Sequence, residues 1–212
     1  MQTKIYNMRT LTVEQIADIA RDLSQGALAV YATDTVYGVG TGAFCEESVQ
    51  RIYALKQRPA TQPLQLLLPS LIEALHIVDF GPGALHVAQV FWPGGLTLIV
   101  PPSKAGKPLL RGSKALGLRV PAHLPLLRIL LQMTMPLAST SANVHGSPTL
   151  TREEDVVKQF DGQVDYILTD GTLSPTASTV LDATGDEPHI LREGSLDIEE
   201  LLSVYEDVED FV

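Results

Sequence analysis

Short apolar runs alternate along this chain with segments whose apolar residues recur at helical spacing. Continuous apolar runs bounded by turn residues predict buried strands, and a spacing of three to four residues predicts a helix that packs through one face. Strands are expected at residues 27–32, 64–68, 96–100, 115–120, 137–140, 166–168, 178–181 and 189–191. Helices are expected at residues 13–23, 46–55, 83–91, 125–133, 153–160 and 198–205.

Residues that begin and end helices support these boundaries. Thr12 precedes the first predicted helix as an N-cap, Gly26 lies just past its end, and Pro59 stops the second helix. Strands and helices alternate without an internal repeat or a low-complexity linker. The pattern therefore predicts an α/β fold with a single domain, residues 1–212, in which a twisted mixed sheet carries helices on both faces.

Composition and cysteine usage narrow the class of protein. Hydrophobic residues make up 45% and charged residues 19% of the 212 residues, which is typical of a globular chain and excludes intrinsic disorder. The single cysteine, Cys45, excludes an internal disulfide framework and a multi-thiolate metal site, and it fits a reducing, cytoplasmic location. The five histidines (76, 86, 123, 145 and 189) show no ligand spacing, so no protein-built metal site is expected.

The most apolar stretch, residues 116–138, does not predict a membrane span. Arg119, His123, Arg128 and three prolines interrupt it, and lipid would leave these charges and the freed carbonyl groups without partners. The first ten residues lack the apolar core of a secretory signal. We therefore expect no association with a membrane.

Charge is distributed unevenly along the chain. The formal net charge is −10, yet residues 51–128 carry nine basic and two acidic side chains, which leaves −17 for the remainder. Residues 80–150 contain no acidic side chain, whereas residues 186–212 carry ten. A net charge this negative disfavours general binding to nucleic acids, which are anionic themselves. The basic block suits a compact polyanion such as a triphosphate, and a solvated basic surface is the alternative.

A polar segment follows the first predicted strand. If the chain stays extended there, Thr33, Thr35 and Tyr37 point to one face at a strand end, where α/β proteins place ligands. A polar turn is the alternative interpretation. The glycines at 38, 40 and 42 match neither the dinucleotide-binding fingerprint nor a P-loop.

Two cationic segments are candidates for anion binding. Lys56 and Arg58 lie at the end of a predicted helix, where they either clamp phosphate groups or complement the helix dipole. Arg119 lies in a strand whose leucine and valine neighbours face the other way, and a charge at such a position requires an anionic partner. That partner is either a ligand or a distant acidic side chain.

Small neutral donors follow the strand predicted at 137–140. Ser139, Ser141 and Asn143 alternate along the chain and would share one side of an extended backbone, which suits the phosphate or ribose oxygens of a ligand. A serine-rich turn that bonds its own backbone is the alternative. The chain lacks the G-x-S-x-G motif, which weakens a hydrolase interpretation.

The order of these motifs resembles the YrdC-like family of threonylcarbamoyl-AMP synthases over about residues 10–195. The most specific part of the resemblance is the pair K-x-R and S-x-N, which marks the synthase branch and is lacking in the YciO-like sister branch. The segments that carry the resemblance are Thr33-Asp34-Thr35-Val36-Tyr37-Gly38, Lys56-Gln57-Arg58-Pro59, Trp92-Pro93-Gly94, Arg119-Val120-Pro121, Ser139-Thr140-Ser141-Ala142-Asn143, Ser178-Thr179-Val180 and Arg192-Glu193-Gly194.

The resemblance implies a fold and a reaction. The family fold is a twisted mixed sheet with helices on both faces around a positively charged pocket. The reaction joins L-threonine, bicarbonate (as CO2) and ATP into L-threonylcarbamoyladenylate and pyrophosphate, with Mg2+ carried by ATP. A downstream threonylcarbamoyl-transferase complex then modifies adenosine 37 of tRNA, so weak tRNA binding is also implied.

The resemblance also implies roles for individual residues. Lys56 and Arg58 would be the catalytic pair that stabilises charge on the leaving pyrophosphate. The implied threonine-binding residues are Thr35, Arg119, Ser139 and Ser178. The implied ATP-binding residues are Lys56, Arg58, Gln62, Ala115, Ser141, Asn143, Thr149 and Arg192.

Three residues depart from the family pattern. Ala32 and Gly95 replace prolines, and Leu67 replaces a histidine that lies near threonine in part of the family. These departures bear on amino-acid specificity more than on ATP use. The acidic tail, residues 196–212, is too short to be the extra C-terminal domain of the longer family form. Two alternative functions remain: a YciO-like paralogue with another substrate, and an RNA-binding module that uses the basic face.

Overall fold

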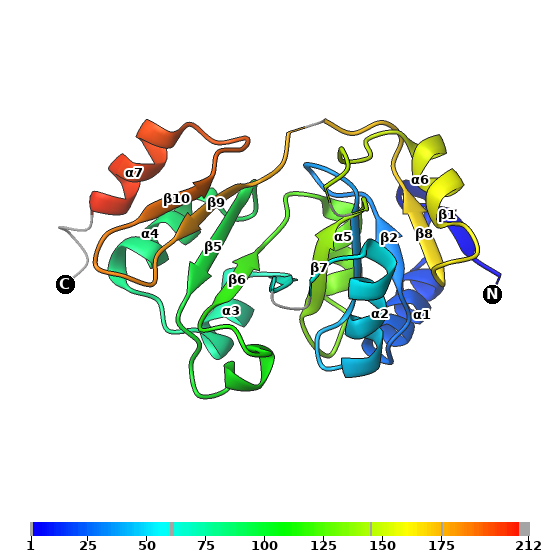
Figure 1. Ribbon diagram of the computed structural model, residues 1–212, viewed down its shortest axis with the longest axis horizontal. Helices are drawn as coiled ribbons and strands as arrows, with labels where there is room; N and C mark the ends of the chain where they lie inside the picture. The colour runs from blue at the N-terminus through cyan, green and yellow to red at the C-terminus, as the bar shows by residue number, and fades with distance from the viewer. Residues whose placement is uncertain (1, 60–61, 145, 175, 208–212) are drawn as a thin grey trace.

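Ten strands form one continuous sheet in the computed structural model, which describes residues 2–59, 62–144, 146–174 and 176–207 (Figure 1). The strands are β1 (Lys4–Asn7), β2 (Ala29–Tyr31), β3 (Gly38–Gly42), β4 (Gln65–Leu67), β5 (Leu96–Val100), β6 (Leu116–Arg119), β7 (Leu137–Ser141), β8 (Tyr166–Thr169), β9 (Thr179–Asp182) and β10 (His189–Arg192). The helices are α1 (Val13–Ser24), α2 (Glu46–Lys56), α3 (Leu71–Ile77), α4 (Pro82–Phe91), α5 (Leu124–Leu130), α6 (Glu153–Phe160) and α7 (Ile198–Glu206), with short 3-10 turns η1 (Met8–Thr10) and η2 (Lys107–Leu109).

The sheet is mixed, as the sequence predicts. Its strand order is β1-β8-β2-β3-β7-β4-β6-β5-β9-β10. The parallel neighbours are β1 with β8, β2 with β8, β4 with β6 and β5 with β9, and the other neighbours are antiparallel. β4 and β7 join at the middle of the order, so they connect the half of the sheet near the N-terminus with the half near the C-terminus (Figure 1).

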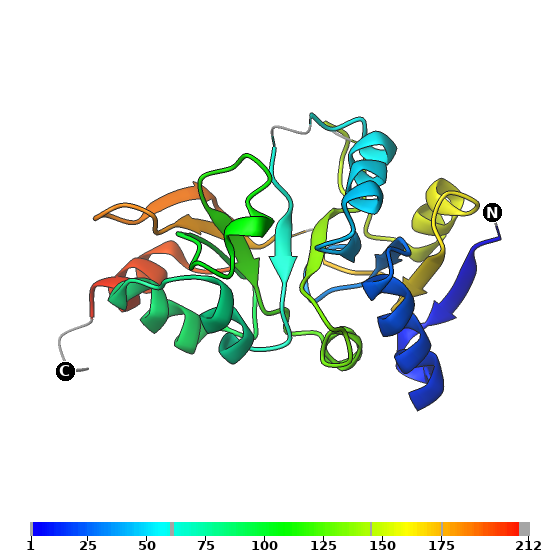
Figure 2. The same cartoon turned by 90° about the horizontal axis from the view of Figure 1, so that it is seen from below.

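Helices cover both faces of the sheet, and this prediction is also confirmed. In Figure 2, α2 and α6 lie on one side of the sheet, while α1, α4 and α5 lie on the other. The start of α1 follows from its local sequence, because Thr12 and Gln15 exchange side-chain and backbone hydrogen bonds in a capping box. The residues that α1 buries against the core are Ile16, Ile19, Ala20 and Leu23.

Every predicted strand and helix is found, with its ends within three residues of the prediction. The elements that the apolar pattern does not predict are β1, β3 and α3. β1 is an edge strand with mostly exposed side chains, and α3 exposes Ile72 and Leu75. Such peripheral elements bury too little apolar surface to produce a periodic pattern.

The third unpredicted element, β3, is hidden by its alternating glycines. These glycines leave room for the ring of Tyr31 on the neighbouring strand. A Cβ at Gly40 would lie 2.6 Å from the Tyr31 hydroxyl, and a Cβ at Gly38 would lie 2.9 Å from the Tyr31 ring. Gly38 and Gly40 therefore allow packing around a fully buried tyrosine, whereas Gly42 allows the close approach of the Leu23 carbonyl and the Met135 sulfur.

β1, near the N-terminus, and α7, near the C-terminus, lie at opposite ends of the molecule (Figure 1). Much of the predicted acidic tail is ordered as α7, which buries Leu201. His145 and residues 208–212 lie outside the described residues. Among the described helices, none combines the length and the apolar character needed to cross a bilayer.

Candidate active site

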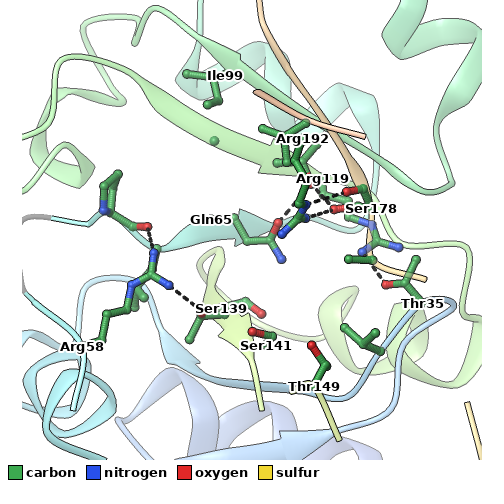
Figure 3. Close-up of a pocket in the computed structure, with 18 of the residues that line it drawn as sticks. Thr35, Arg58, Gln65, Ile99, Arg119, Ser139, Ser141, Thr149, Ser178 and Arg192 are labelled. Atoms are coloured by element: carbon green, nitrogen blue, oxygen red, sulfur yellow. Dashed lines mark hydrogen bonds between the residues drawn. The ribbon is translucent and has the colours of Figure 1, made fainter. Parts of the chain in front are cut away.

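A cavity of about 300 Å³ lies at the centre of the sheet, where its two halves meet. Residues of β4, β5, β6, β7, β9 and β10 line it, together with residues of the segments that follow β2, α2 and β7 and that precede β6 and β9 (Figure 3). The lining residues are Thr35, Val36, Arg58, Pro63, Leu64, Gln65, Thr97, Ile99, Ala115, Gly117, Arg119, Ser139, Thr140, Ser141, Thr149, Ala177, Ser178, Val180 and Arg192.

The alternation of residues along β6 directs Arg119 into this cavity. Leu116 and Leu118 are buried in the core on one face of the strand, whereas Gly117 and Arg119 line the cavity on the other. The predicted orientation of Arg119 is therefore confirmed. The missing side chain at Gly117 keeps the floor of the cavity open beside it.

Three acceptors hold the guanidinium of Arg119. Nη2 donates to Asp34 Oδ1 at 2.7 Å, Nη1 donates to Thr35 Oγ1 at 2.9 Å, and Nε donates to the Gly94 carbonyl at 2.9 Å. Of the two partners left open by the sequence, the distant acidic side chain is thus present, and it is Asp34. Five N–H groups and three acceptors leave two hydrogens of the guanidinium for a ligand.

The hydroxyl of Thr35 is oriented by its neighbour. Thr33 Oγ1 donates its hydrogen to the Val36 carbonyl at 2.7 Å, so in its 3.0 Å contact with Thr35 it can only accept. Thr35 therefore donates to Thr33 and accepts from Arg119. The Thr35 hydroxyl oxygen keeps one lone pair for a ligand, so Thr35 acts as an acceptor in the cavity.

The segment around these threonines differs from one prediction. The chain bends at residues 34–36 instead of staying extended, so Tyr37 does not share a face with Thr33 and Thr35. The Tyr37 hydroxyl donates to the Gly171 carbonyl at 2.6 Å and does not line the cavity. Tyr37 thus tethers the bend to the segment after β8.

A second hydrogen-bond chain runs along the other wall of the cavity. Thr97 Oγ1 donates to Gln65 Oε1 at 3.1 Å, and it therefore accepts in its 2.9 Å contact with Ser178 Oγ. Ser178 Oγ in turn accepts from Arg192 Nη2 at 2.9 Å, while Arg192 Nε donates to the Ser178 carbonyl. This series of hydrogen bonds fixes the side chains of Arg192 and Ser178 beside the start of β9.

Ser139 is positioned by the buried tyrosine described above. The Tyr31 hydroxyl donates to Ser139 Oγ at 2.5 Å, and burial raises the pKa of Tyr31, so the phenol stays protonated as a donor. The hydrogen of the Ser139 hydroxyl is then free to point into the cavity. Ser139 can act there as a donor, which complements the acceptor at Thr35.

Arg58 approaches the cavity from the opposite side. Its guanidinium donates to Thr140 Oγ1 at 3.3 Å and to the carbonyls of Gln62 and Pro63 at 3.3 and 3.2 Å. These contacts are long, and Arg58 remains half-buried and available to an incoming anion. In Figure 3, Arg58 faces Arg119 and Arg192 across the cavity.

Lys56 lies beneath the turn that follows β7. It is 2% exposed, and its Nζ donates to the Ser141 carbonyl, to the Asn143 carbonyl at 2.5 Å and to Asn143 Oδ1 at 3.1 Å. Ser141 Oγ also donates to Asn143 Oδ1, at 2.6 Å. Burial, with a contribution from Arg58, lowers the pKa of Lys56 to about 8. The ammonium thus organises the turn from below.

The cavity is strongly cationic. Burial lowers the pKa of Arg58, Arg119 and Arg192, and the nearby charge of Arg119 lowers the pKa of Arg192 further. Asp34 is the one acid that forms an ion pair with any of the three among the described residues. Unpaired guanidinium groups at such close quarters are stabilised by an anionic ligand.

The structure brings most of the predicted site residues together. Those that line the cavity are Thr35, Arg58, Ala115, Arg119, Ser139, Ser141, Thr149, Ser178 and Arg192. Lys56, Gln62 and Asn143 do not line it. The ligand-binding roles of all these residues stay predictions. Ser139 and Ser141 of β7 both line the cavity, and so does Thr140 between them, so the predicted one-sided arrangement with Asn143 is not found.

Sequence reasoning missed polar residues inside apolar strands. Gln65 opens the run at β4, and Thr97 interrupts the apolar run of β5. Their signal is a single polar residue in a buried strand, which requires a hydrogen-bond partner.

No group of three or more histidine, cysteine, aspartate or glutamate side chains in the described parts of the chain could hold a metal ion.

Comparison with known protein families matches residues 21–194 to the Sua5/YciO/YrdC family model, whose description is "Telomere recombination". A threonylcarbamoyl-AMP synthase of Pyrococcus abyssi is 35% identical over 207 residues, which cover 95% of this chain and 61% of the relative. A threonylcarbamoyl-AMP synthase of Bacillus subtilis is 32% identical and covers 90% of this chain and 56% of the relative. The chain thus spans less than two thirds of the length of these relatives.

Solved structures share the fold. Sua5 of P. abyssi, complexed with L-threonine, superposes with a TM-score of 0.88 at 32% identity, covering 97% of this chain and 62% of that one. YciO of Escherichia coli superposes with a TM-score of 0.85 at 26% identity, covering 94% of this chain and 100% of that one. The twisted mixed α/β architecture is therefore common to all three.

Proposed function

This chain belongs to the Sua5/YciO/YrdC family, and on that premise we propose that it is an L-threonylcarbamoyladenylate synthase. Such an enzyme condenses L-threonine, bicarbonate and ATP and releases pyrophosphate. The observation that carries the proposal is the position of Arg58 opposite Arg119 and Arg192 in one cavity. Two anionic ends, a carboxylate and a triphosphate, complement that arrangement. The relatives named threonylcarbamoyl-AMP synthase and the Sua5 structure with L-threonine support it.

We assign the amino-acid end of the cavity to the Arg119 side. The two remaining N–H groups of the Arg119 guanidinium would donate hydrogen bonds to the threonine carboxylate. Thr35 would accept a hydrogen bond from the amino acid, and Ser139 would donate one, because their hydrogens are oriented in those directions. Ser178 would contribute its remaining lone pair at the same end.

We assign the nucleotide end to the Arg58 side. Arg58 would neutralise the phosphates, and Ser141 would contact a phosphate or ribose oxygen. Arg192 lies across the cavity from Arg58, beside Arg119, so it would reach the phosphate nearest the amino-acid end. Ala115 and Thr149 line the cavity where the base or ribose would lie. Lys56 and Asn143 would act through the turn that carries Ser141, and Gln62 would act through the carbonyl that accepts from Arg58.

The proposed chemistry needs positioning more than covalent participation by the protein. The threonine amine adds to CO2, forms an N–C bond and loses a proton, which gives a carbamate. A carbamate oxygen then forms a bond to the α-phosphorus as the bond to pyrophosphate breaks. Bicarbonate supplies the CO2, and one water molecule is released in the overall reaction. Holding the three reactants in one small cavity and neutralising their charges would account for most of the acceleration.

Magnesium would enter as part of the nucleotide substrate. When bound, it would add positive charge beside the β- and γ-phosphates. The residues on this side of the cavity supply hydroxyl and guanidinium groups, which suit phosphate oxygens. An ion that comes with ATP and keeps its waters fits this lining better than a metal held by the protein.

The product would be passed to a threonylcarbamoyl transferase that acts on adenosine 37 of tRNA, because a mixed anhydride of this kind hydrolyses in water. Direct tRNA binding would be weak, since the net charge of −10 opposes it. A cytoplasmic location remains a prediction from the sequence.

Pyrophosphate release from ATP tests the proposal. We expect pyrophosphate and an AMP-linked product only when threonine and bicarbonate are both present. Turnover that ignores both co-substrates, or no turnover under any of these conditions, would refute the assignment.

A YciO-like paralogue with another substrate is the second candidate. Its support is Leu67, a buried aliphatic residue where part of the family has a histidine near threonine, although short bacterial members have an aliphatic residue there too. The intact Lys56-Gln57-Arg58 and Ser141-Ala142-Asn143 segments disfavour it. Turnover with bicarbonate and an amino acid other than threonine would identify that case.

Salt-dependent RNA binding without ATP consumption would instead identify an RNA-binding module.

A further inference from the structure

Gln65 is the polar side chain in the middle of the cavity that the substrate assignments above leave unused. It lies between Arg58 on one side and the group of Arg119, Arg192 and Ser178 on the other (Figure 3). Its neighbour on β7 is Ser139, and its neighbour on β6 is Gly117. Because Gly117 has no side chain, Gln65 stays uncovered on that flank.

The hydrogen bonds of Gln65 give its amide a direction. Oε1 accepts from the Thr97 hydroxyl at 3.1 Å. That hydroxyl accepts from Ser178 in turn, so the chain from Arg192 through Ser178 and Thr97 ends on Oε1. The nitrogen Nε2 makes no hydrogen bond with any of the described residues, although the side chain is half-buried and lines the cavity. It therefore presents two N–H donors to whatever occupies the centre.

On the proposed function, threonine, bicarbonate and ATP would react at the centre of the cavity. If the amino-acid carboxylate binds at Arg119 and the phosphates bind at Arg58, the carboxylated amine must lie between them, beside Gln65. A carbamate has two oxygens: one attacks the α-phosphorus, and the other needs a hydrogen-bond donor once water is excluded.

We propose that Gln65 Nε2 binds the carboxyl group derived from bicarbonate, and this inference rests on the proposed synthase function. A neutral amide suits that task. A cation at this position would draw electron density from the attacking oxygen, whereas an amide N–H orients the group without neutralising its charge. Gln65 is then a substrate-contacting residue for the carbamate.

A purely structural role for Gln65 makes a different prediction. In that case Gln65 would matter only because its Oε1 accepts the hydrogen bond of Thr97 Oγ1, and Thr97 in turn orients Ser178. Glutamate at position 65 keeps such an acceptor but removes the N–H donors. Valine at position 97 breaks the same chain but leaves the donors of Gln65 in place. The two variants therefore separate the two roles.

The experiment measures initial pyrophosphate release against bicarbonate concentration in CO2-depleted buffer, with threonine and ATP saturating. We expect Q65M to raise the KM for bicarbonate about tenfold, the effect of one lost hydrogen bond to a charged group, while the KM for ATP changes by less than about twofold. Q65E should be impaired at least as much, because it places a second negative charge beside the carbamate. T97V should raise the bicarbonate KM less than Q65M does, because it keeps both N–H donors of Gln65 and removes only the hydrogen bond that orients them.

A matched control is Q50M, which makes the same substitution on the exposed face of α2. It should behave as the wild type, and circular dichroism should show that every variant is folded. Q65E with wild-type kinetics, together with T97V reproducing Q65M, would overturn the proposal. An unchanged bicarbonate KM in Q65M would overturn it alone. A wild-type enzyme without bicarbonate-dependent turnover would instead remove the synthase function and this inference together.

Discussion

Arg119 is a cation with a partner before any ligand arrives. Asp34 neutralises it, and Thr35 and the Gly94 carbonyl fix the plane of its guanidinium. At 3% exposure, an unpaired arginine would cost several kcal/mol of stability. The pairing therefore keeps the folded protein stable while leaving two N–H groups in a fixed direction for a carboxylate.

Replacement of Arg119 by lysine tests this arrangement. A lysine keeps the charge but cannot serve three acceptors and a carboxylate from one nitrogen, so we expect threonine affinity to weaken by about 1–3 kcal/mol. ATP affinity should change much less. Isothermal titration of threonine and of ATP into both proteins measures this. A loss confined to ATP would place Arg119 in the phosphate site instead.

Arg58 and Lys56 should differ in what their removal costs. Arg58 makes only long hydrogen bonds within the protein, so R58A should lower ATP affinity at least about tenfold with little change in melting temperature. K56A should also lower the melting temperature, because the Asn143 carbonyl loses its donor and the turn loses the ammonium that joins it to α2. Calorimetry and ATP titration separate the two variants. Unchanged ATP binding in R58A would contradict its phosphate role.

The pKa of Lys56 predicts a dependence of stability on pH. Burial lowers this pKa from 10.5 to about 8, so between these values the unfolded chain holds the proton that the folded protein has lost. The contribution of Lys56 to the free energy of unfolding should then rise as pH increases from about 8 toward 10.5. Urea unfolding of the wild type and K56M at pH 7.5 and 9.5 measures that difference. A fall would mean that the three oxygens hold the proton.

At the scale of elements, β3 and β7 together position a side chain of the site. The glycines of β3 make room for Tyr31, whose hydroxyl holds Ser139 on β7. A strand with so few side chains is weak by itself, but here it lies between β2 and β7 and is buried along its length. Packing therefore determines its conformation, and its sequence permits the close approach.

Alanine at position 40 should show this coupling. Its Cβ would lie 2.6 Å from both the Tyr31 hydroxyl and the Ala138 carbonyl, so we expect a loss of about 1–3 kcal/mol in the free energy of unfolding. Threonine affinity should fall too, because Tyr31 would move away from Ser139. The matched control is G117A, whose Cβ meets atoms only at 3.9 Å and should leave stability nearly unchanged. Equal stabilities of G40A and G117A would argue against the tight packing.

At the scale of the whole molecule, the cavity belongs to both halves of the sheet. Arg58 and Ser139 come from the half near the N-terminus, whereas Arg119 and Arg192 come from the other half. A ligand that bridges them should stabilise the folded protein as a unit. At 100 times the dissociation constant, the stabilisation is about 2.7 kcal/mol, which corresponds to a rise of about 5–10 °C in melting temperature.

Thermal shifts should therefore separate the two ends of the cavity. We expect ATP to raise the melting temperature of R119K as much as that of the wild type, and that of R58A by about half as much or less. Threonine should raise that of R58A as much as that of the wild type, and that of R119K by about half as much or less. Differential scanning fluorimetry measures all six combinations. Loss of both shifts in both variants would mean that the two ends do not bind separately.

The sequence alone determined the elements whose apolar pattern is long or whose ends carry clear signals. α1 follows from its stripe and its Thr12 cap, and β5 and α6 begin and end where predicted. The direction of Arg119 was also predictable, because the strand period assigns its neighbours to the core. These features depend on local backbone geometry, which a short segment specifies by itself.

Only the tertiary structure decided how distant segments complete the site. Asp34 meets Arg119, and Thr97 links Gln65 with Ser178, across separations that no local pattern encodes. The bend at residues 34–36 and the burial of Lys56 under the Ser141 turn also depend on where other strands lie. The physical reason is that a buried polar group must find a partner, and the order of the strands in the sheet determines which partner is within reach.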